Sequence, residues 1–155
     1  MKLDIRFLIG WFLFGGISGA GAGQLATGFG LGFPATDAFL ATSLIAIGIG
    51  IYGATFPIFR YRNQLEKVQQ QSVKRPDPLL SFRLLVLARA VMITGLGFLG
   101  WHIGQLIWLW LFSIAPTGLV LPTLVGVAAS LLMYLGGLWA EYNCRLPKDP
   151  DGETA

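Results

Sequence analysis

Charged residues are scarce in this sequence. Asp, Glu, Lys and Arg make up 12% of its 155 residues, whereas 54% are hydrophobic. A soluble domain usually carries about 25% charged residues, so a soluble fold of this composition would lack the polar side chains that cover a surface. The mean hydropathy of +0.65 points the same way. We therefore exclude the soluble class and predict an integral membrane protein.

The sequence is also poor in the residue types that build chemical sites. It has one cysteine, Cys144, and one histidine, His102, which excludes an internal disulfide and a zinc site made of several cysteines. It contains no P-loop, no HExxH and no Gly-x-Ser-x-Gly motif. We predict no catalytic, cofactor-binding or metal-binding residues, and therefore no enzymatic activity.

Four apolar runs are long enough to cross a bilayer, which takes about 20 residues of α-helix. They cover 7–26, 38–57, 91–112 and 118–140, and the third helix is expected to start in the cytoplasm near residue 79. The connections 27–37 and 113–117 are short, which makes neighbouring helices antiparallel. We predict an all-α domain, 1–140, of four transmembrane helices in two antiparallel hairpins, with a basic loop at 60–78 and a polar tail at 141–155.

The basic residues predict the orientation. All eleven lie in the N-terminal segment, around the middle loop or in the C-terminal tail, and the two short connections have none. Segments rich in Lys and Arg stay in the cytoplasm. We expect both termini and the middle loop to be cytoplasmic, in a multi-pass protein of the plasma membrane. The net charge of +3 then reflects orientation, and no nucleic-acid partner is expected.

The N-terminus also fits a cleavable signal peptide. Lys2 and Arg6 precede an apolar run, and Ala20-Gly21-Ala22 resembles a small-residue cleavage site. The apolar run continues past Ala22, however, and is long enough to span. We favour a retained first helix.

The middle loop predicts contact with lipid headgroups. Its basic side chains include Arg60, Arg62, Lys74 and Arg75. Each basic residue near an anionic membrane surface contributes about 1 kcal/mol to binding. A regulatory partner for this loop is the alternative interpretation.

The third span carries a row of small residues. Gly97, Gly100 and Gly104 follow one another at spacings of three and four residues, so they share one helix face. Small residues let transmembrane helices approach closely, and Gly100 and Gly104 form a GxxxG motif. We predict that this face packs against another helix.

His102 and Gln105 are predicted to make polar contacts inside the membrane. At 100° per residue, His102 lies roughly 160° from both Gly100 and Gly104. An ionisable residue within a span does not face lipid, so the third helix is expected to be contacted on two faces. A hydrogen bond from neutral His102 to another helix is the simpler interpretation, and a proton relay or a metal role is the alternative.

Arg89 and Glu141 form a candidate ion pair. Glu141 closes the fourth span, and Arg89 precedes the third on the same side of the membrane. Pairing lowers the cost of placing either charge near the bilayer. Arg83 is a rival partner for Glu141.

The second half of the chain resembles a known family. The matching features are Asp77-Pro78, Arg83-Leu-Leu-Val-Leu-Ala-Arg-Ala90, Gly95 to Gly100-Trp101-His102-x-Gly104, and Glu141-x-x-Cys144-Arg145-x-Pro147. With these, the chain is similar to a family of small actinobacterial membrane proteins with four helices, classed only as a domain of unknown function (number 3180). The resemblance implies an actinobacterial plasma membrane and no established activity.

Two functional hypotheses remain open at this stage. The first is a non-enzymatic accessory or scaffold protein that works through helix contacts, with membrane lipids and either a membrane-protein partner or further copies of itself. The alternative is a small transporter or permease-like component that acts as an oligomer. Transport requires polar groups along a path, and His102, Gln105 and Gln24 are few for that purpose.

Overall fold

The computed structural model of the chain describes residues 4–67, 78–112 and 117–144, except for the side chains of residues 61, 62, 64–67, 78 and 117. These residues form four long α-helices and one short 3-10 helix. They are α1 (Ile5–Gly28), α2 (Ala38–Lys67), α3 (Pro78–Leu111), η1 (Thr117–Leu119) and α4 (Val120–Cys144). All four α-helices are long and apolar enough to cross a membrane.

Three of the helices begin at residues that favour a helix start. The Asp4 side chain accepts a hydrogen bond from Arg6 N at 3.3 Å, and Asp37 accepts one from Ala38 N at 2.8 Å. Such carboxylates satisfy the free N–H groups at a helix start. Proline favours the first turn of a helix, where no N–H is needed, and Pro78 begins α3.

The second helix is longer than the span predicted at 38–57. It continues beyond Pro57 to Lys67, so the first part of the predicted loop 60–78 belongs to α2. A proline inside a helix removes one backbone hydrogen bond. The residues after Pro57 include good helix formers such as Leu65, Glu66 and Lys67, which favour continuing the helix beyond that defect.

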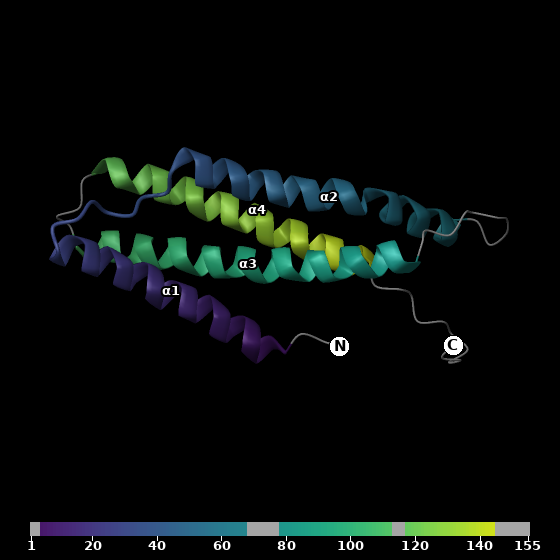
Figure 1. Cartoon of the computed structure of the whole chain (residues 1–155), viewed down its shortest axis with the longest axis horizontal. Coiled ribbons are helices and arrows are strands. Elements are labelled where there is room, and N and C mark those ends of the chain that lie inside the picture. The colour runs from purple at the N-terminus through teal and green to yellow at the C-terminus, as the bar shows by residue number, and fades with distance from the viewer. Residues whose placement is uncertain (1–3, 68–77, 113–116, 145–155) are drawn as a thin grey trace.

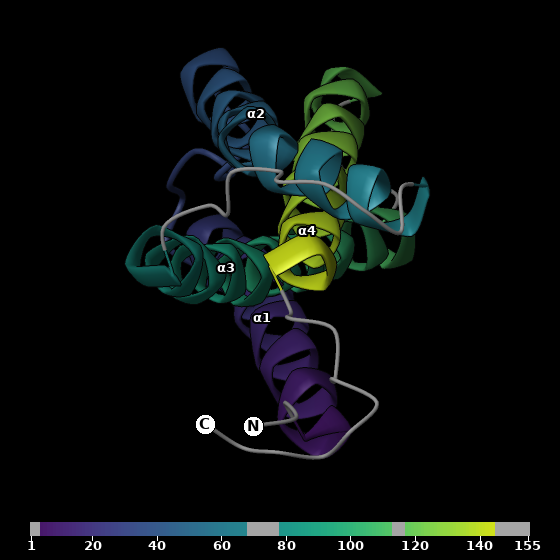
Figure 2. The same ribbon diagram turned by 90° about the vertical axis from the view of Figure 1, so that its right-hand side faces the viewer.

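The helices pack in an order that differs from their order in the sequence. Figures 1 and 2 show α1 on one side of α3 and the α2–α4 pair on the other. Among the described residues, α1 contacts α3 alone, α3 contacts α4 extensively, and α2 lies mainly on α4. The starts of α1 and α3 and the ends of α2 and α4 lie at one end of the bundle, the terminal end (Figure 1). The opposite end carries loop 29–37, and we call it the loop end.

The first predicted hairpin is therefore not a packed pair. The helices that follow each other as 7–26 and 38–57 run in opposite directions, but α1 and α2 do not touch. Instead, α1 lies parallel to α3, and α2 lies parallel to α4 (Figure 1). The physical reason is that α1 carries a glycine face complementary to one on α3.

That glycine interface brings two backbones into contact. A Cβ at Gly19 would fall against the Trp101 carbonyl, and a Cβ at Gly100 or Gly104 would fall against the backbone of α1. Gly97 lies against the Trp11 ring, because a Cβ there would be 2.6 Å from Trp11 Nε1. The three glycines predicted to pack, Gly97, Gly100 and Gly104, therefore all face α1.

The core lies between the other three helices. Its buried residues are Ala41, Leu44, Ile51, Ala88, Val91, Ala129, Met133 and Ala140. Most of the large apolar side chains on α1 are exposed, as are Phe39 and Trp110. An apolar exterior of this kind is suited to a hydrocarbon environment, where exposed apolar groups carry no hydration cost.

Candidate functional site

Loop 29–37 folds back onto the bundle and builds a cluster of polar contacts. The Phe33 ring stacks on Trp108, with centroids 5.4 Å apart. The carbonyl of Pro34 accepts a hydrogen bond from Gln105 Nε2 at 2.8 Å. Trp108 Nε1 donates in turn to Gln24 Oε1 of α1 at 2.9 Å. The loop thus joins α1 and α3 at the loop end.

His102 faces α4, on the side of α3 away from α1. The side chain is 1% exposed, and its Nδ1 lies 2.8 Å from Phe98 O and 3.0 Å from Ser130 Oγ. Ser130 donates its own proton to Gly126 O at 2.7 Å. With Gly97, Gly100 and Gly104 facing α1, the third helix is contacted on two faces.

Two buried polar atoms in the described part of the chain have no hydrogen-bond partner. They are Thr36 Oγ1 and Gln105 Oε1. Thr36 Oγ1 lies close to His102, because a Cβ placed on Gly126 would fall against Thr36 Oγ1 and 2.7 Å from His102 Nε2. We define the polar cluster as Gln24, Thr36, His102, Gln105, Trp108 and Ser130.

The sequence predicted two of the six residues of this cluster as polar contacts, His102 and Gln105. Thr36 lies next to Asp37, whose side chain accepts from Ala38 N, but Thr36 Oγ1 itself lies beside His102. In the sequence, Ser130 is a small residue of the fourth predicted span, and Gln24 is a single polar residue near the end of the first. Neither position carries a sequence signal that points to α3.

The bond between Trp108 and Gln24 offers a test of the cluster. We expect Trp108→Phe to lower the free energy of unfolding by about 1–2 kcal/mol, because it removes one hydrogen bond from a ring that is 8% exposed. Thermal unfolding in detergent micelles measures this change. The matched control is Trp110→Phe at a ring that is 90% exposed, and an equal loss in both variants would contradict the assigned role of Trp108.

Arg89 and Glu141 meet toward the terminal end of the bundle. Arg89 Nε donates to Glu141 Oε1 at 3.0 Å, with side chains that are 27% and 5% exposed. The two charges join α3 to α4, far along the helices from the polar cluster. Cys144 lies one turn beyond Glu141 as a buried free thiol.

Of the predicted headgroup contacts, Arg60 lies toward the same end. Arg60 is exposed on α2, beyond Pro57. The side chain of Arg62, and Lys74 and Arg75, lie outside the described residues. The described residues contain no group of three or more His, Cys, Asp or Glu side chains that could hold a metal ion.

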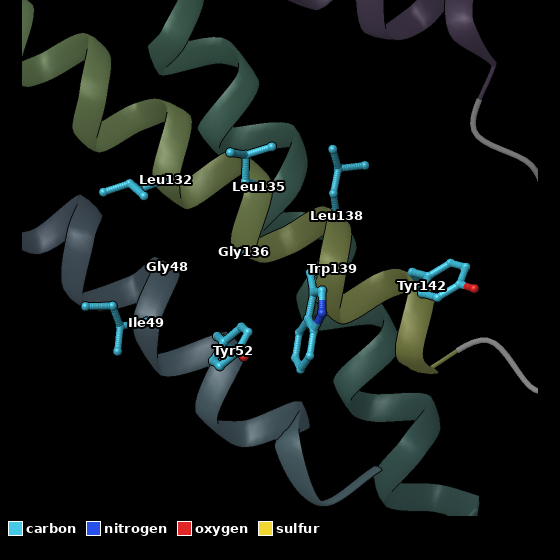
Figure 3. A pocket seen from close by; sticks show the side chains of 9 residues that line it. All are labelled: Gly48, Ile49, Tyr52, Leu132, Leu135, Gly136, Leu138, Trp139 and Tyr142. Carbon is cyan, nitrogen blue, oxygen red and sulfur yellow. The ribbon is translucent and has the colours of Figure 1, made fainter. Parts of the chain in front are cut away.

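An apolar groove runs between α2 and α4 (Figure 3). Its volume is about 690 Å³, within the range of roughly 300–1,000 Å³ typical of ligand sites. Tyr52 stacks on Trp139 at 4.1 Å across the groove. The lining residues are Gly48, Ile49, Tyr52, Leu132, Leu135, Gly136, Leu138, Trp139 and Tyr142.

Comparison with known protein families gives a match over most of the chain. The model of a family described as "Protein of unknown function (DUF3180)" matches residues 8–148. Among curated proteins and among solved structures, nothing matches the chain.

Proposed function

Because the chain belongs to the DUF3180 family, whose description assigns no function, we propose its role from the geometry: a non-enzymatic accessory or scaffold protein of the plasma membrane. It works by presenting helix surfaces to a membrane-protein partner. In this proposal the terminal end faces the cytoplasm, since the basic residues of the described helices lie toward that end, and Arg60 contacts lipid headgroups.

The polar side chains of the spans support a packing role. Thr55, Thr123 and Ser130 are fully buried, and each donates to the carbonyl four residues earlier in the chain, at 2.8, 2.8 and 2.7 Å. Each of these hydroxyls has given its one proton to the backbone, and its complete burial places it in a packed interface. A transport path needs polar groups that face a common lumen, so these contacts favour the scaffold over the transporter.

The groove between α2 and α4 carries the proposal. Its lining is aliphatic and aromatic, and Ile49, Leu132, Leu135 and Tyr142 are between 48% and 66% exposed. The lining residues of α4 run from Leu132 to Tyr142, roughly 15 Å of helix axis, which matches about three turns of a partner helix. Helices associate in membranes by close packing. The groove therefore fits a ridge of side chains from a partner helix.

A groove-filling variant tests the proposal. We expect Leu135→Trp to abolish co-purification of a stoichiometric membrane partner from the source organism in mild detergent, because the indole occupies the space that the partner helix needs. Mass spectrometry of the native preparation gives the readout. The matched control is Leu121→Trp, at a residue of α4 that is 70% exposed and does not line the groove.

Each outcome has a clear meaning. A partner that is retained by Leu121→Trp and lost by Leu135→Trp supports both the scaffold role and the groove. A partner that both variants retain supports an accessory role but moves the contact away from the groove. A native preparation that holds only copies of this chain contradicts the proposal and favours transport by an oligomer.

A further inference from the structure

Two buried atoms of the polar cluster make no hydrogen bond to any described residue. Gln105 is 0% exposed, and its Oε1 has no partner although its Nε2 holds Pro34 O at 2.8 Å. Thr36 Oγ1 is likewise buried and unpaired. A buried polar group left without a partner costs about 1–3 kcal/mol, and the cost is higher within a membrane. Such atoms indicate a bound polar molecule.

The neighbours of His102 decide which of its nitrogens carries the proton. Phe98 O is a carbonyl and only accepts, so Nδ1, 2.8 Å away, must be the protonated nitrogen. Ser130 gives its single hydroxyl proton to Gly126 O, so its oxygen accepts from Nδ1 at 3.0 Å. A charged imidazole is costly inside an apolar helix. His102 is therefore neutral, with Nε2 as a bare acceptor.

Two other unused polar groups belong to neighbours of this nitrogen, Thr36 of the loop and Gln105 of α3. His102 Nε2 and Thr36 Oγ1 both lie next to the position that a Gly126 Cβ would take, yet no hydrogen bond joins them directly. Gln105 follows His102 by one helical turn, and its amide is anchored two residues before Thr36. The geometry thus places one hydroxyl beside the acceptor Nε2, and a second unused acceptor, Gln105 Oε1, belongs to the residue one helical turn further along α3.

We infer that Thr36, His102 and Gln105 bind one buried water molecule. The water donates to His102 Nε2 and to Gln105 Oε1, and it accepts the proton of Thr36 Oγ1–H. A buried water typically makes two to four such bonds. An anion does not suit two acceptors, and the Asp37 carboxylate that would favour a cation is exposed and bound to Ala38 N.

This site goes beyond the proposed scaffold role. His102 lies six residues before Trp108, roughly 9 Å along the helix axis, so the water lies on the loop-end side of the bundle. It connects Thr36 of loop 29–37 to His102 and Gln105 of α3. The loop is then held by a solvent molecule as well as by the bond from Gln105 to Pro34.

The single histidine makes the inference directly testable. Protein labelled with 15N-histidine and reconstituted in phospholipid bilayers contains one imidazole, so solid-state NMR shows one pair of ring nitrogens. We expect a protonated Nδ1, a non-protonated but hydrogen-bonded Nε2, and a cross-peak from water to the ring. Thr36→Val removes one of the three partners at nearly constant shape, and we expect it to abolish the water cross-peak and shift Nε2 toward the unbonded position.

Two further variants sharpen the result. Thr36→Ser keeps the hydroxyl and is expected to retain the cross-peak. Thr42→Val removes a hydroxyl that bonds Ala38 O at 2.7 Å within α2 and is expected to change nothing at His102. A wild-type ring with Nε2 protonated, or with no contact to water, overturns the inference even if Thr36→Val fails to fold. An unchanged cross-peak in folded Thr36→Val also overturns it.

Discussion

Gly19→Leu is expected to detach α1 from α3. The new side chain would meet the Trp101 backbone, where a Cβ alone already falls against the carbonyl and 2.9 Å from Cα. Backbone atoms of a packed helix cannot swing aside as a flexible side chain does. We expect a loss of about 3 kcal/mol or more, which corresponds to a fall of roughly 6–12 °C in melting temperature for a protein of this size.

The same helix supplies the control. Gly21 lies two residues away, and a Cβ there would have no atom within 4 Å. Gly21→Leu adds the same side chain to α1 without touching α3, and we expect its melting temperature in detergent to stay near that of the wild type. If the two variants have the same melting temperature, the glycine interface does not hold α1 against α3.

Arg89→Leu is expected to have the second large effect. It leaves the Glu141 carboxylate, whose side chain is 5% exposed, without the guanidinium that lies 3.0 Å away. Breaking a buried pair costs about 3–5 kcal/mol, and we expect about 2–3 kcal/mol here because Arg89 retains 27% of its exposure. The free energy of unfolding in micelles measures the loss.

A double-mutant cycle separates the pair from the single residues. The double variant Arg89→Leu/Glu141→Leu removes both charges of this pair, so we expect it to be more stable than the sum of the two single losses predicts. Arg60→Leu, at an exposed position on α2, is expected to change stability by less than about 0.5 kcal/mol. Strictly additive losses from Arg89 and Glu141 would show that the two side chains do not support each other.

Hydropathy and spacing predicted the helices well, because a bilayer imposes a length and a polarity on every span. The glycine row at Gly97, Gly100 and Gly104 could be recognised as a packing face for the same reason: small residues recur where backbones approach. Arg89 and Glu141 could be paired because both flank a span on one side. These inferences need only the local sequence and the thickness of the membrane.

The partner of each face could not be predicted in this way. The row on α3 indicates that some helix packs there, but its match with Gly15 and Gly19 on α1 depends on the crossing of two distant segments. Loop 29–37 is short enough to suggest a hairpin, and yet it lets α2 lie on α4. The contacts of Thr36 and Gln24 follow from that arrangement, so they were missed with it.

The packing order has a consequence for synthesis. The helices enter the membrane in chain order, but α1 meets its only contact among the described helices, α3, after 83 further residues, roughly 4–17 s of translation at 5–20 residues per second. During that interval α1 and α2 follow one another in sequence but do not pack together. Each is then a separate span that is exposed to lipid and to the insertion machinery. The principal partner of α2 is α4, the last helix made. Assembly of the bundle therefore follows the completion of the chain, and a product truncated before α4 leaves α2 without its main support.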